Sequence, residues 1–262
     1  MILKVKFYLL NLSIVKQFLS IIYNLINSKV KIFKKNNLWI HQFEDKYLIN
    51  FHPILNFTKF KNIHNFFCKK YMPKKNDIII DVGSGLGQEL LFFSRKIGNK
   101  GKVFAIESDP RLYKVLKKMI TLNKLKNVFL LNSFFYKKNN HHIISRLQPL
   151  NNWMSNSINS KNGKNFKLKT ITIDYLIKKY NLKKINFAKF NIEGSELNLL
   201  SGNDIFLKRC MNICISCHDF INKREFKTFK IIKKLLIKKN FYIYKNLEDD
   251  KIRKFFIYAK KK

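Results

Sequence analysis

The chain has 262 residues, enough for one sizeable hydrophobic core with a small accessory region, and too few for two full domains. Its formal net charge of +37 comes from 53 Lys and Arg against 16 Asp and Glu, and a charge of that size attracts nucleic acid and anionic lipid in a salt-dependent way. However, 47 of the basic residues are Lys and only 6 are Arg, the residue that makes bidentate contacts to phosphate and guanine. The composition is therefore more typical of an A/T-rich genome than of a dedicated nucleic-acid binder.

The N-terminal segment from Phe7 to Ile26 is strongly apolar, but its longest unbroken apolar run covers only 7–10. A spanning helix needs about 18 apolar residues, and no small-residue cleavage site follows, so neither a membrane span nor a secretory signal is predicted. Polar residues recur at helical spacing along one side: Lys16, Ser20, Asn24 and Asn27. We expect an amphipathic helix whose wide apolar face either packs on the body of the protein or lies on an anionic membrane surface.

The rest of the chain alternates between strand and helix patterns. Residues 38–60 suggest a small β or mixed lead-in. From Asp77 onward the predicted strands are 77–82, 102–107, 127–132, 184–192 and 211–217. The helical patterns between and after them are 88–97, 111–122, 174–180, 196–200 and 224–239. Nearly all-apolar strands separated by helices are typical of a mostly parallel sheet covered on both faces, which is an α/β fold.

Two stretches depart from this alternation. Residues 241–246 and 254–260, joined by a charged turn, predict a hairpin that closes the sheet with an antiparallel strand. Residues 134–165 are rich in Asn, Ser and Lys and contain Trp153. We predict a long loop there, and a loop of that length in a compact domain usually covers a site.

The four cysteines are Cys68, Cys210, Cys214 and Cys217. Cys214 and Cys217 form a CxxC, but they lie in a predicted buried strand, where positions three apart point to opposite faces. Zinc ligation is therefore not expected, and reduced thiols of a cytoplasmic protein are the better interpretation.

A glycine-rich loop follows the first predicted strand of the sheet. The sequence DVGSGLG runs from Asp81 to Gly87, and Gly83, Gly85 and Gly87 let the backbone pass close to a ligand before a helix begins. A dinucleotide fingerprint would need a third Gly where Gln88 stands. The pattern D-x-G-x-G-x-G instead resembles motif I of S-adenosylmethionine-dependent methyltransferases.

Polar residues also end the next two predicted strands. Glu107 and Ser108 end the second, where an acidic side chain can accept both hydroxyls of a ribose. Asn132 and Ser133 end the third, at the height of an adenine amino group. Loop, acid and polar strand end, in this order, form a much more specific signal than a lone glycine loop.

The most unusual stretch is NFAKFNIEGSELNLL, residues 186–200, which concentrates scarce carboxylates where a strand meets a helix. Strand alternation would place Lys189, Asn191 and Glu193 on one face. Glu196 lies three residues beyond Glu193, so the two carboxylates are expected to be neighbours with split pKa values. His218, which follows the next predicted strand, should reach the same rim.

With these residues in view, the region from about Asp77 to Asp219 resembles the FkbM family of methyltransferases. The matching segments are DVGSGLGQE, GKVFAIESDPRLYKVLKKMITLN, TITIDYL, KFNIEGSELNLLSG and ISCHDF. The EGSE corner is specific to that family rather than to the fold. The resemblance implies a Rossmann-like class I methyltransferase domain over residues 66–262, preceded by a helix and lead-in over 1–65. It also implies methyl transfer from S-adenosylmethionine to a hydroxyl of a sugar, polysaccharide or glycolipid.

The candidate site residues follow from the motifs and the resemblance, and no metal ligand is expected. The candidate cofactor-binding residues are Asp81, Gly83, Gly85, Gly87, Glu107, Ser108, Asn132, Ser133 and Asn191. The candidate catalytic residues are Lys189, Glu193, Glu196 and His218. Many members of the family have Asp where this chain has Asn191, so removal of the hydroxyl proton falls to Glu193, Glu196 or His218.

Two other functions remain open from the sequence. An RNA methyltransferase would suit the charge, although the chain has no NPPY-like or DPPY-like motif and no Pro-Cys pair. A binding protein that keeps the fold without turnover would suit Asn191. We expect a small-molecule or glycan acceptor as partner, with weak contact between residues 1–30 and an anionic membrane surface, and a cytoplasmic location.

Overall fold

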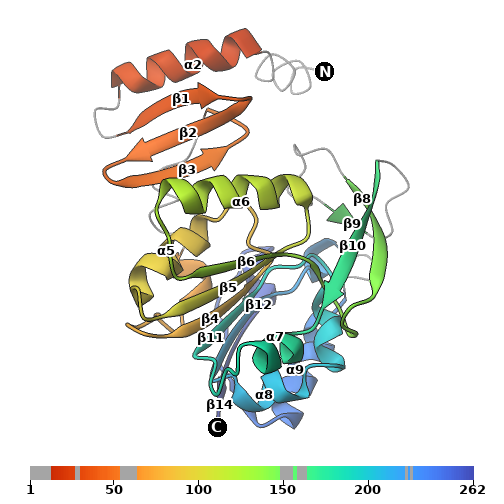
Figure 1. The fold of residues 1–262 in the computed structure, drawn as a ribbon. Helices are drawn as coiled ribbons and strands as arrows, with labels where there is room; N and C mark the ends of the chain where they lie inside the picture. Colours follow the sequence, from red (N-terminus) through yellow and green to blue (C-terminus); the bar gives the residue numbers. More distant parts are fainter. Residues whose placement is uncertain are drawn as a thin grey trace.

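The structure is a computed structural model that describes residues 13–26, 30–53, 64–147, 156–157, 164–221, 224 and 227–262 (Figure 1). The predictions made for residues 7–12, Asn27 and Trp153 lie outside these residues. Among the described helices, none is long and apolar enough to cross a membrane.

A seven-stranded sheet forms the centre of the molecule, in the order β13-β14-β12-β11-β4-β5-β6. Its strands are β4 (Ile78–Val82), β5 (Lys102–Glu107), β6 (Val128–Asn132), β11 (Phe187–Phe190), β12 (Asn212–Ser216), β13 (Phe241–Ile243) and β14 (Phe256–Lys261). The first five of these pair in parallel, whereas β14 runs antiparallel to both β12 and β13. The predicted parallel sheet with an antiparallel C-terminal strand is confirmed.

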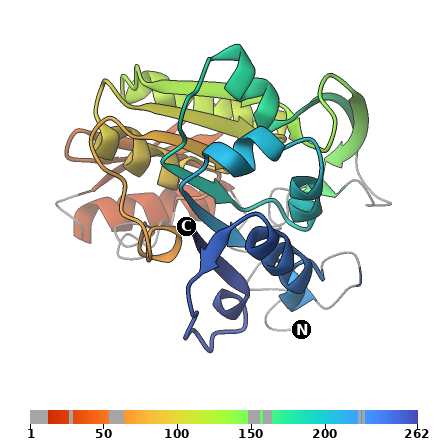
Figure 2. The same cartoon turned by 90° about the horizontal axis from the view of Figure 1, so that it is seen from below.

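Helices cover both faces of the sheet (Figures 1 and 2). The longer helices around the sheet are α5 (Gln88–Ile97), α6 (Pro110–Leu122), α7 (Ile173–Lys179), α8 (Asp204–Arg209) and α9 (Phe229–Lys238). The short helices are α4 (His64–Phe67), η1 (Ser195–Leu200), η2 (Asp219–Ile221) and η4 (Arg253–Phe255). Leu90 and Leu116 of α5 and α6 belong to one core, and Leu176 and Leu236 of α7 and α9 belong to the other. Each side of the sheet therefore has its own hydrophobic core.

The four thiols are free and buried within these cores. Cys214 packs with Cys68 in the core on the α5 and α6 side, while Cys217 packs with Cys210 in the core on the α7 and α9 side. Cys214 of β12 and Cys217, which follows that strand directly, thus lie on opposite sides of the sheet, as strand geometry predicts.

The predicted lead-in is a three-stranded antiparallel sheet. It consists of β1 (Lys31–Lys35), β2 (Leu38–Phe43) and β3 (Lys46–Asn50). Asn36 and Asn37 have φ of 49° and 60°, the left-handed pair that a two-residue hairpin turn requires. This sheet lies between α6 and α2 (Ser13–Ile26) in Figure 1.

Two asparagine side chains occupy the open edges of the three-stranded sheet. Asn24 of α2 accepts from the backbone N–H of Ile32 and donates to its C=O, both at 2.7 Å. Asn123, at the end of α6, accepts from the N–H of Tyr47 at 2.9 Å and donates to its C=O at 2.7 Å. Each amide therefore pairs the outward-facing backbone groups of one edge residue, Ile32 on β1 and Tyr47 on β3.

Helix α2 is oriented against expectation. Its polar side faces the sheet, because Asn24 binds β1 and Ser20 is buried, whereas Ile14, Phe18 and Leu25 are among its most exposed side chains. The expectation that the apolar face packs on the body of the protein holds for only part of that face, because Tyr23 packs against the core on the α5 and α6 side while Ile14, Phe18 and Leu25 do not.

The long loop predicted for residues 134–165 is wrong for the residues described there. They contribute to a second sheet, in the order β7-β10-β8-β9, made of β7 (Phe134–Phe135), β8 (His142–Leu147), β9 (Asn156–Ser157) and β10 (Asn165–Ile171). In β10 the exposed Lys167 and Lys169 alternate with the buried Leu168 and Thr170. That period-two pattern was hidden by the surrounding Asn and Lys.

Candidate functional site

The glycine loop connects β4 to α5 and is shaped by three different environments. At Gly83, with φ 76°, an added Cβ would lie 2.0 Å from the carbonyl oxygen of Asn191, so the loop rests directly on the chain that leaves β11. At Gly87, with φ 80°, a Cβ would lie 2.4 Å from Cε of Met119 on α6. At Gly85, with φ 57°, a Cβ would meet no atom within 4 Å. The loop is thus packed on both sides and faces open space at its centre.

Glu107 stands beside that open space, at the end of β5 where it was predicted. Its carboxylate accepts from the backbone N–H of Gly85 and from that of Asp109, each at 2.8 Å, and it is 5% exposed. Burial raises the pKa of Glu107 to about 7, against the opposing effect of these two hydrogen bonds. The side chain therefore connects the glycine loop to the end of β5. With a pKa of about 7, its carboxyl can exchange a proton near neutral pH.

The next strand end is joined to Glu107. Asn132 lies opposite Glu107 in the register of β5 and β6, and its amide donates to the carbonyl oxygens of Glu107 at 2.8 Å and Ser108 at 3.3 Å. Ser108 and Ser133 are half-buried at the same edge of the sheet. The donor of Asn132 is thus used within the protein, which leaves its Oδ1 for a ligand.

Lys189 is 1% exposed and lies beneath the glycine loop. Its Nζ is 2.9 Å from Oδ1 of Asp81 and donates to the carbonyl oxygen of Gly83 at 2.7 Å. Burial by itself lowers the pKa of Lys189, but the neighbouring carboxylates, Asp81 first among them, outweigh it and raise the pKa above its ordinary value. Because β11 ends at Phe190, the predicted alternation that would place Lys189 on one face with Asn191 and Glu193 does not hold.

Asn191 and Glu193 follow the strand as a tight turn. The backbone N–H of Asn191 donates to the carbonyl oxygen of Val82, which fixes this corner against the end of β4. Glu193 has a φ of 50°. Burial raises its pKa to about 8, and the charges of Glu107 and Glu196 act in the same direction. The charge of Glu193 is therefore coupled both to Glu107 at the end of β5 and to Glu196 in η1.

The site around the loop is acidic although the protein is strongly basic. Asp81, Glu89 and Glu107 all act on the charge of Lys189. The pKa of Glu89 is raised by burial, as are those of Glu107 and Glu193. Several carboxylates grouped around a single buried lysine are suited to a cationic ligand, because an added positive charge would relieve their repulsion.

Glu196 and His218 form a buried pair at the ends of β11 and β12. Nδ1 of His218 is 2.9 Å from Oε1 of Glu196, and the two side chains are 6% and 0% exposed. Since a carboxylate can only accept, Nδ1 is the donor, and the lone pair of a neutral imidazole lies on Nε2. The ring of Phe220 has its centroid 5.3 Å from that of His218. The predicted convergence of Glu196 and His218 on one rim is confirmed.

Thr228 supports this pair and was missed in the sequence. Its hydroxyl donates to Oε2 of Glu196 at 3.3 Å, and it is fully buried. Asp219 accepts from the backbone N–H groups of Thr228 and Phe229, which fixes the start of α9 against the end of β12. Thr228 lies 32 residues from Glu196 in an ordinary polar context, so no local signal pointed to it.

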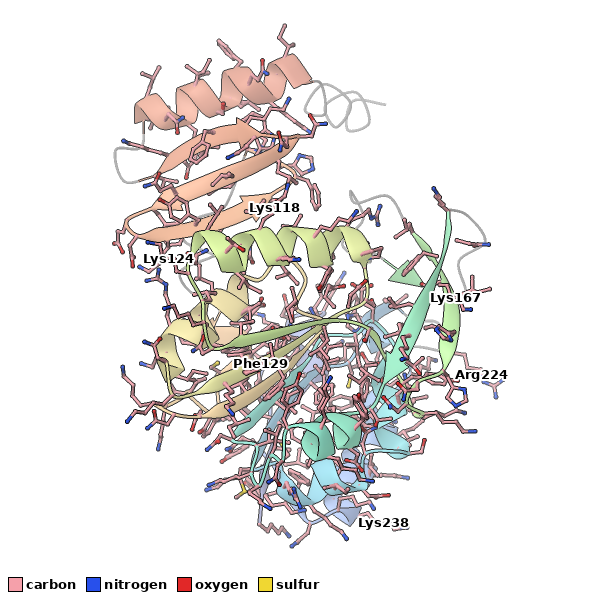
Figure 3. All side chains as sticks on the ribbon, in the orientation of Figure 1. Lys118, Lys124, Phe129, Lys167, Arg224 and Lys238 are labelled. Atoms are coloured by element: carbon pink, nitrogen blue, oxygen red, sulfur yellow. The ribbon has the colours of Figure 1, made fainter. Side chains whose placement is uncertain are left out.

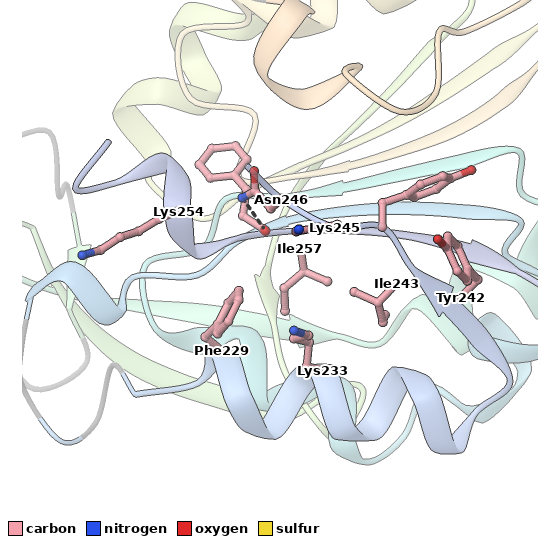
Figure 4. Close-up of a pocket in the computed structure, with 10 residues that line it drawn as sticks. Phe229, Lys233, Tyr242, Ile243, Lys245, Asn246, Lys254 and Ile257 are labelled. Carbon is pink, nitrogen blue, oxygen red and sulfur yellow. Dashed lines mark hydrogen bonds between the residues drawn. The ribbon is translucent and has the colours of Figure 1, made fainter. Parts of the chain in front are cut away.

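Two cavities of the described structure lie away from the glycine loop. A groove of about 370 Å³ between α9 and the C-terminal hairpin is lined by Phe229, Lys233, Tyr242 and their neighbours (Figure 4). A second, of about 420 Å³, is lined by residues that include Cys68 and Tyr258. Neither contains a residue of the glycine loop. Among the described residues, no three His, Cys, Asp or Glu side chains are grouped as metal ligands.

Comparisons with known proteins agree with this geometry. The model of the family described as "Methyltransferase FkbM domain" matches residues 81–244, which include the glycine loop, Glu107, the EGSE corner and His218. No curated protein matches the chain.

Among solved structures, a methyltransferase FkbM from Methylobacillus flagellatus KT aligns with a TM-score of 0.50 and 14% identity, over 73% of this chain and 45% of that one. A SAM-dependent methyltransferase from Aquifex aeolicus aligns with a TM-score of 0.44 and 17% identity, over 79% and 98%. Fibrillarin from Aeropyrum pernix, with natively bound S-adenosyl-L-methionine, aligns with a TM-score of 0.46 and 11% identity, over 88% and 98%. At 14% identity, the likeness to the FkbM methyltransferase structure bears on the fold alone.

Proposed function

Because the chain belongs to the FkbM family of S-adenosylmethionine-dependent methyltransferases, we propose that it methylates a hydroxyl group of a sugar, polysaccharide or glycolipid. The single observation that carries this proposal is the buried Glu196–His218 pair at the same sheet edge as the glycine loop. It places an imidazole that can act as a general base at the edge of the sheet that carries the cofactor loop, and transfer to an alcohol requires such a base.

The cofactor site fits S-adenosylmethionine, which supplies a methyl group on a positively charged sulfur. Asp81, Glu89 and Glu193 would surround that charge, and Glu107 would accept from the ribose hydroxyls. The open space at Gly85 admits a ligand against the backbone of the loop. Lys189 holds Asp81 and the carbonyl of Gly83 in place from below, so its role is to position the loop rather than to touch the acceptor.

We assign proton removal to His218. Transfer of a methyl group to an alcohol is an in-line displacement with a neutral leaving group, so alignment and one base dominate. Glu196 fixes the tautomer by accepting from Nδ1, and Nε2 is then the basic atom. The pKa of Glu193 is raised to about 8, so that carboxyl is largely protonated at neutral pH before the cofactor enters. The Phe220 ring beside the imidazole would suit the apolar face of a sugar.

An RNA acceptor is the second candidate, and the net charge of +37 is the observation that favours it. The labelled lysines in Figure 3 lie on separate parts of the surface, with Lys118 on α6, Lys124 in the turn after α6, Lys167 on β10 and Lys238 on α9. A charge spread in this way supports general attraction to polyanions rather than one nucleic-acid face.

Four buried free thiols support a reducing, cytoplasmic location.

Three measurements test the proposal. Calorimetry with S-adenosylmethionine should show binding, and purified protein with the methyl-labelled cofactor should label a glycan or glycolipid fraction rather than total RNA. His218→Asn should lower kcat by about 100-fold or more with unchanged cofactor affinity, because it removes only the base. Glu196→Gln should lower kcat by at least about tenfold, since an amide no longer fixes the tautomer.

His142→Asn is the matched control, because His142 is exposed on β8, and it should leave kcat unchanged. Label in RNA alone would replace the carbohydrate acceptor with RNA. Full activity of His218→Asn would remove His218 as the base, and absence of cofactor binding would defeat the assignment of the site.

A further inference from the structure

The outer face of α2 is apolar and exposed. Ile14, Phe18, Ile21, Leu25 and Ile26 are 76%, 64%, 57%, 80% and 74% exposed, and we call these five residues the apolar helix face. Four of them recur at spacings of four, three and four, which places them along one side of the helix. Isolated exposed apolar residues are common, but a continuous stripe of this kind marks an interaction site.

Specific contacts fix the orientation of α2, and they determine that the apolar helix face points away from the three-stranded sheet. The Asn24 amide makes two hydrogen bonds of 2.7 Å to the edge of β1. The three-stranded sheet already buries its own apolar residues, among them Trp39 and Leu48 at 2% exposure each. Turning the apolar side inward would break the Asn24 contacts and expose the polar side in its place.

Charge indicates what covers this face. The first 43 residues contain seven Lys and no Asp or Glu. Lys31 and Lys35 are exposed on β1, the strand that α2 contacts. Lys16 of α2 is partly buried, and its pKa is lowered by burial and by the charge of Lys34. An apolar stripe with basic residues at its base matches the surface of an anionic bilayer, where acyl chains lie beneath negative headgroups.

A second copy of the chain fits this face less well. Pairing two copies through α2 would bring together two acid-free, lysine-rich segments of chains that each carry a charge of +37. Helix α2 has 14 residues, or about 21 Å, and lies at the outer end of the molecule beyond the three-stranded sheet (Figure 1). It can therefore lie flat on a surface without displacing another element.

We propose that α2 and β1 form a docking face for an anionic membrane surface, with the apolar helix face inserted among the lipids and the lysines of β1 against their headgroups. The contact is peripheral, and it is separate from the methyl-transfer site at the carboxyl ends of the central strands.

The test is sedimentation of the full-length protein with vesicles of phosphatidylcholine alone or mixed with phosphatidylglycerol, at low and at high salt. The protein should bind the mixed vesicles, and binding should weaken in high salt and without the anionic lipid. The double variant Phe18→Ser and Ile21→Ser should weaken binding by at least about tenfold. Both side chains are exposed, so the variant should keep the thermal transition of the parent.

The double variant Ile144→Ser and Ile237→Ser is the matched control, because these residues are 63% and 57% exposed on β8 and α9. It should bind vesicles as the parent does. Equal binding by both double variants would mean that net charge alone attracts the protein, and the proposal would fail. It would fail equally if the parent ignored anionic vesicles, or if light scattering showed a dimer that only the α2 variant dissociates.

Discussion

The buried contact between Lys189 and Asp81 offers the sharpest test of how the cofactor loop is held. The two side chains are 1% and 0% exposed, and Nζ also donates to the carbonyl oxygen of Gly83. Lys189→Met keeps the aliphatic stem but leaves a buried carboxylate without its partner, so we expect a loss of about 3–5 kcal/mol in the free energy of unfolding. Asp81→Asn should cost less, because Glu89 and Glu107 still compensate the lysine.

The measurement is urea denaturation followed by tryptophan fluorescence, since Trp39 is buried in the core on the α5 and α6 side. The double variant Lys189→Met with Asp81→Asn removes both charges together. Its destabilisation should be smaller than the sum of the single losses by at least about 1.5 kcal/mol. Additivity within about 0.5 kcal/mol would refute the reasoning, because it would show that the two charges do not depend on each other.

Three further outcomes follow from the site and its support. Because folded Glu107 and Glu193 hold protons that unfolded carboxyls with a pKa near 4.5 have released, the free energy of unfolding should fall between about pH 5 and 8. Each group contributes at most about 1.4 kcal/mol per pH unit to this fall. Urea denaturation of Glu193→Gln at several pH values should show a smaller dependence of the free energy of unfolding on pH. An unchanged pH dependence would contradict the raised pKa of Glu193. Gly85→Ala should weaken cofactor binding in calorimetry by at least about tenfold, with little loss of stability beyond the strain of its own backbone. Gly83→Ala should lower the melting temperature far more, because its Cβ would meet the backbone of Asn191, just after β11. Asn123→Ala should cost about 1–3 kcal/mol in urea denaturation, since it leaves two backbone groups of β3 unpaired, and a neutral result would show that water replaces the amide.

Local signals were sufficient for the sheet that carries the cofactor loop. The helix at 88–97 and the strand at 102–107 have the predicted bounds, because a glycine turn, an apolar run and a helical pattern follow each other without interruption. The positions of Glu107 and His218 at strand ends follow from the same alternation.

What the sequence could not supply was the information that depends on distant partners. Lys189 was expected at a strand end on a shared face, but its partner Asp81 lies 108 residues earlier, and a single buried ion pair leaves no local pattern. The two faces of α2 were recognised, but amphipathicity does not say which face turns inward. That choice depends on the hydrogen bonds of Asn24 to β1.

The raised pKa values of Glu107 and Glu193 have a consequence for turnover. Under the proposed function, each reaction converts a charged sulfonium into a neutral thioether and releases one proton from the acceptor hydroxyl. Carboxyls with pKa values of about 7 and 8 can give up a proton when the cation enters and take one back when its charge is lost. The net charge of the pocket together with its ligand would then stay nearly constant through the cycle, because Glu107 and Glu193 release and take up protons as the charge of the ligand changes. Acidic solution should accordingly favour retention of the spent cofactor, and alkaline solution its exchange for a fresh one.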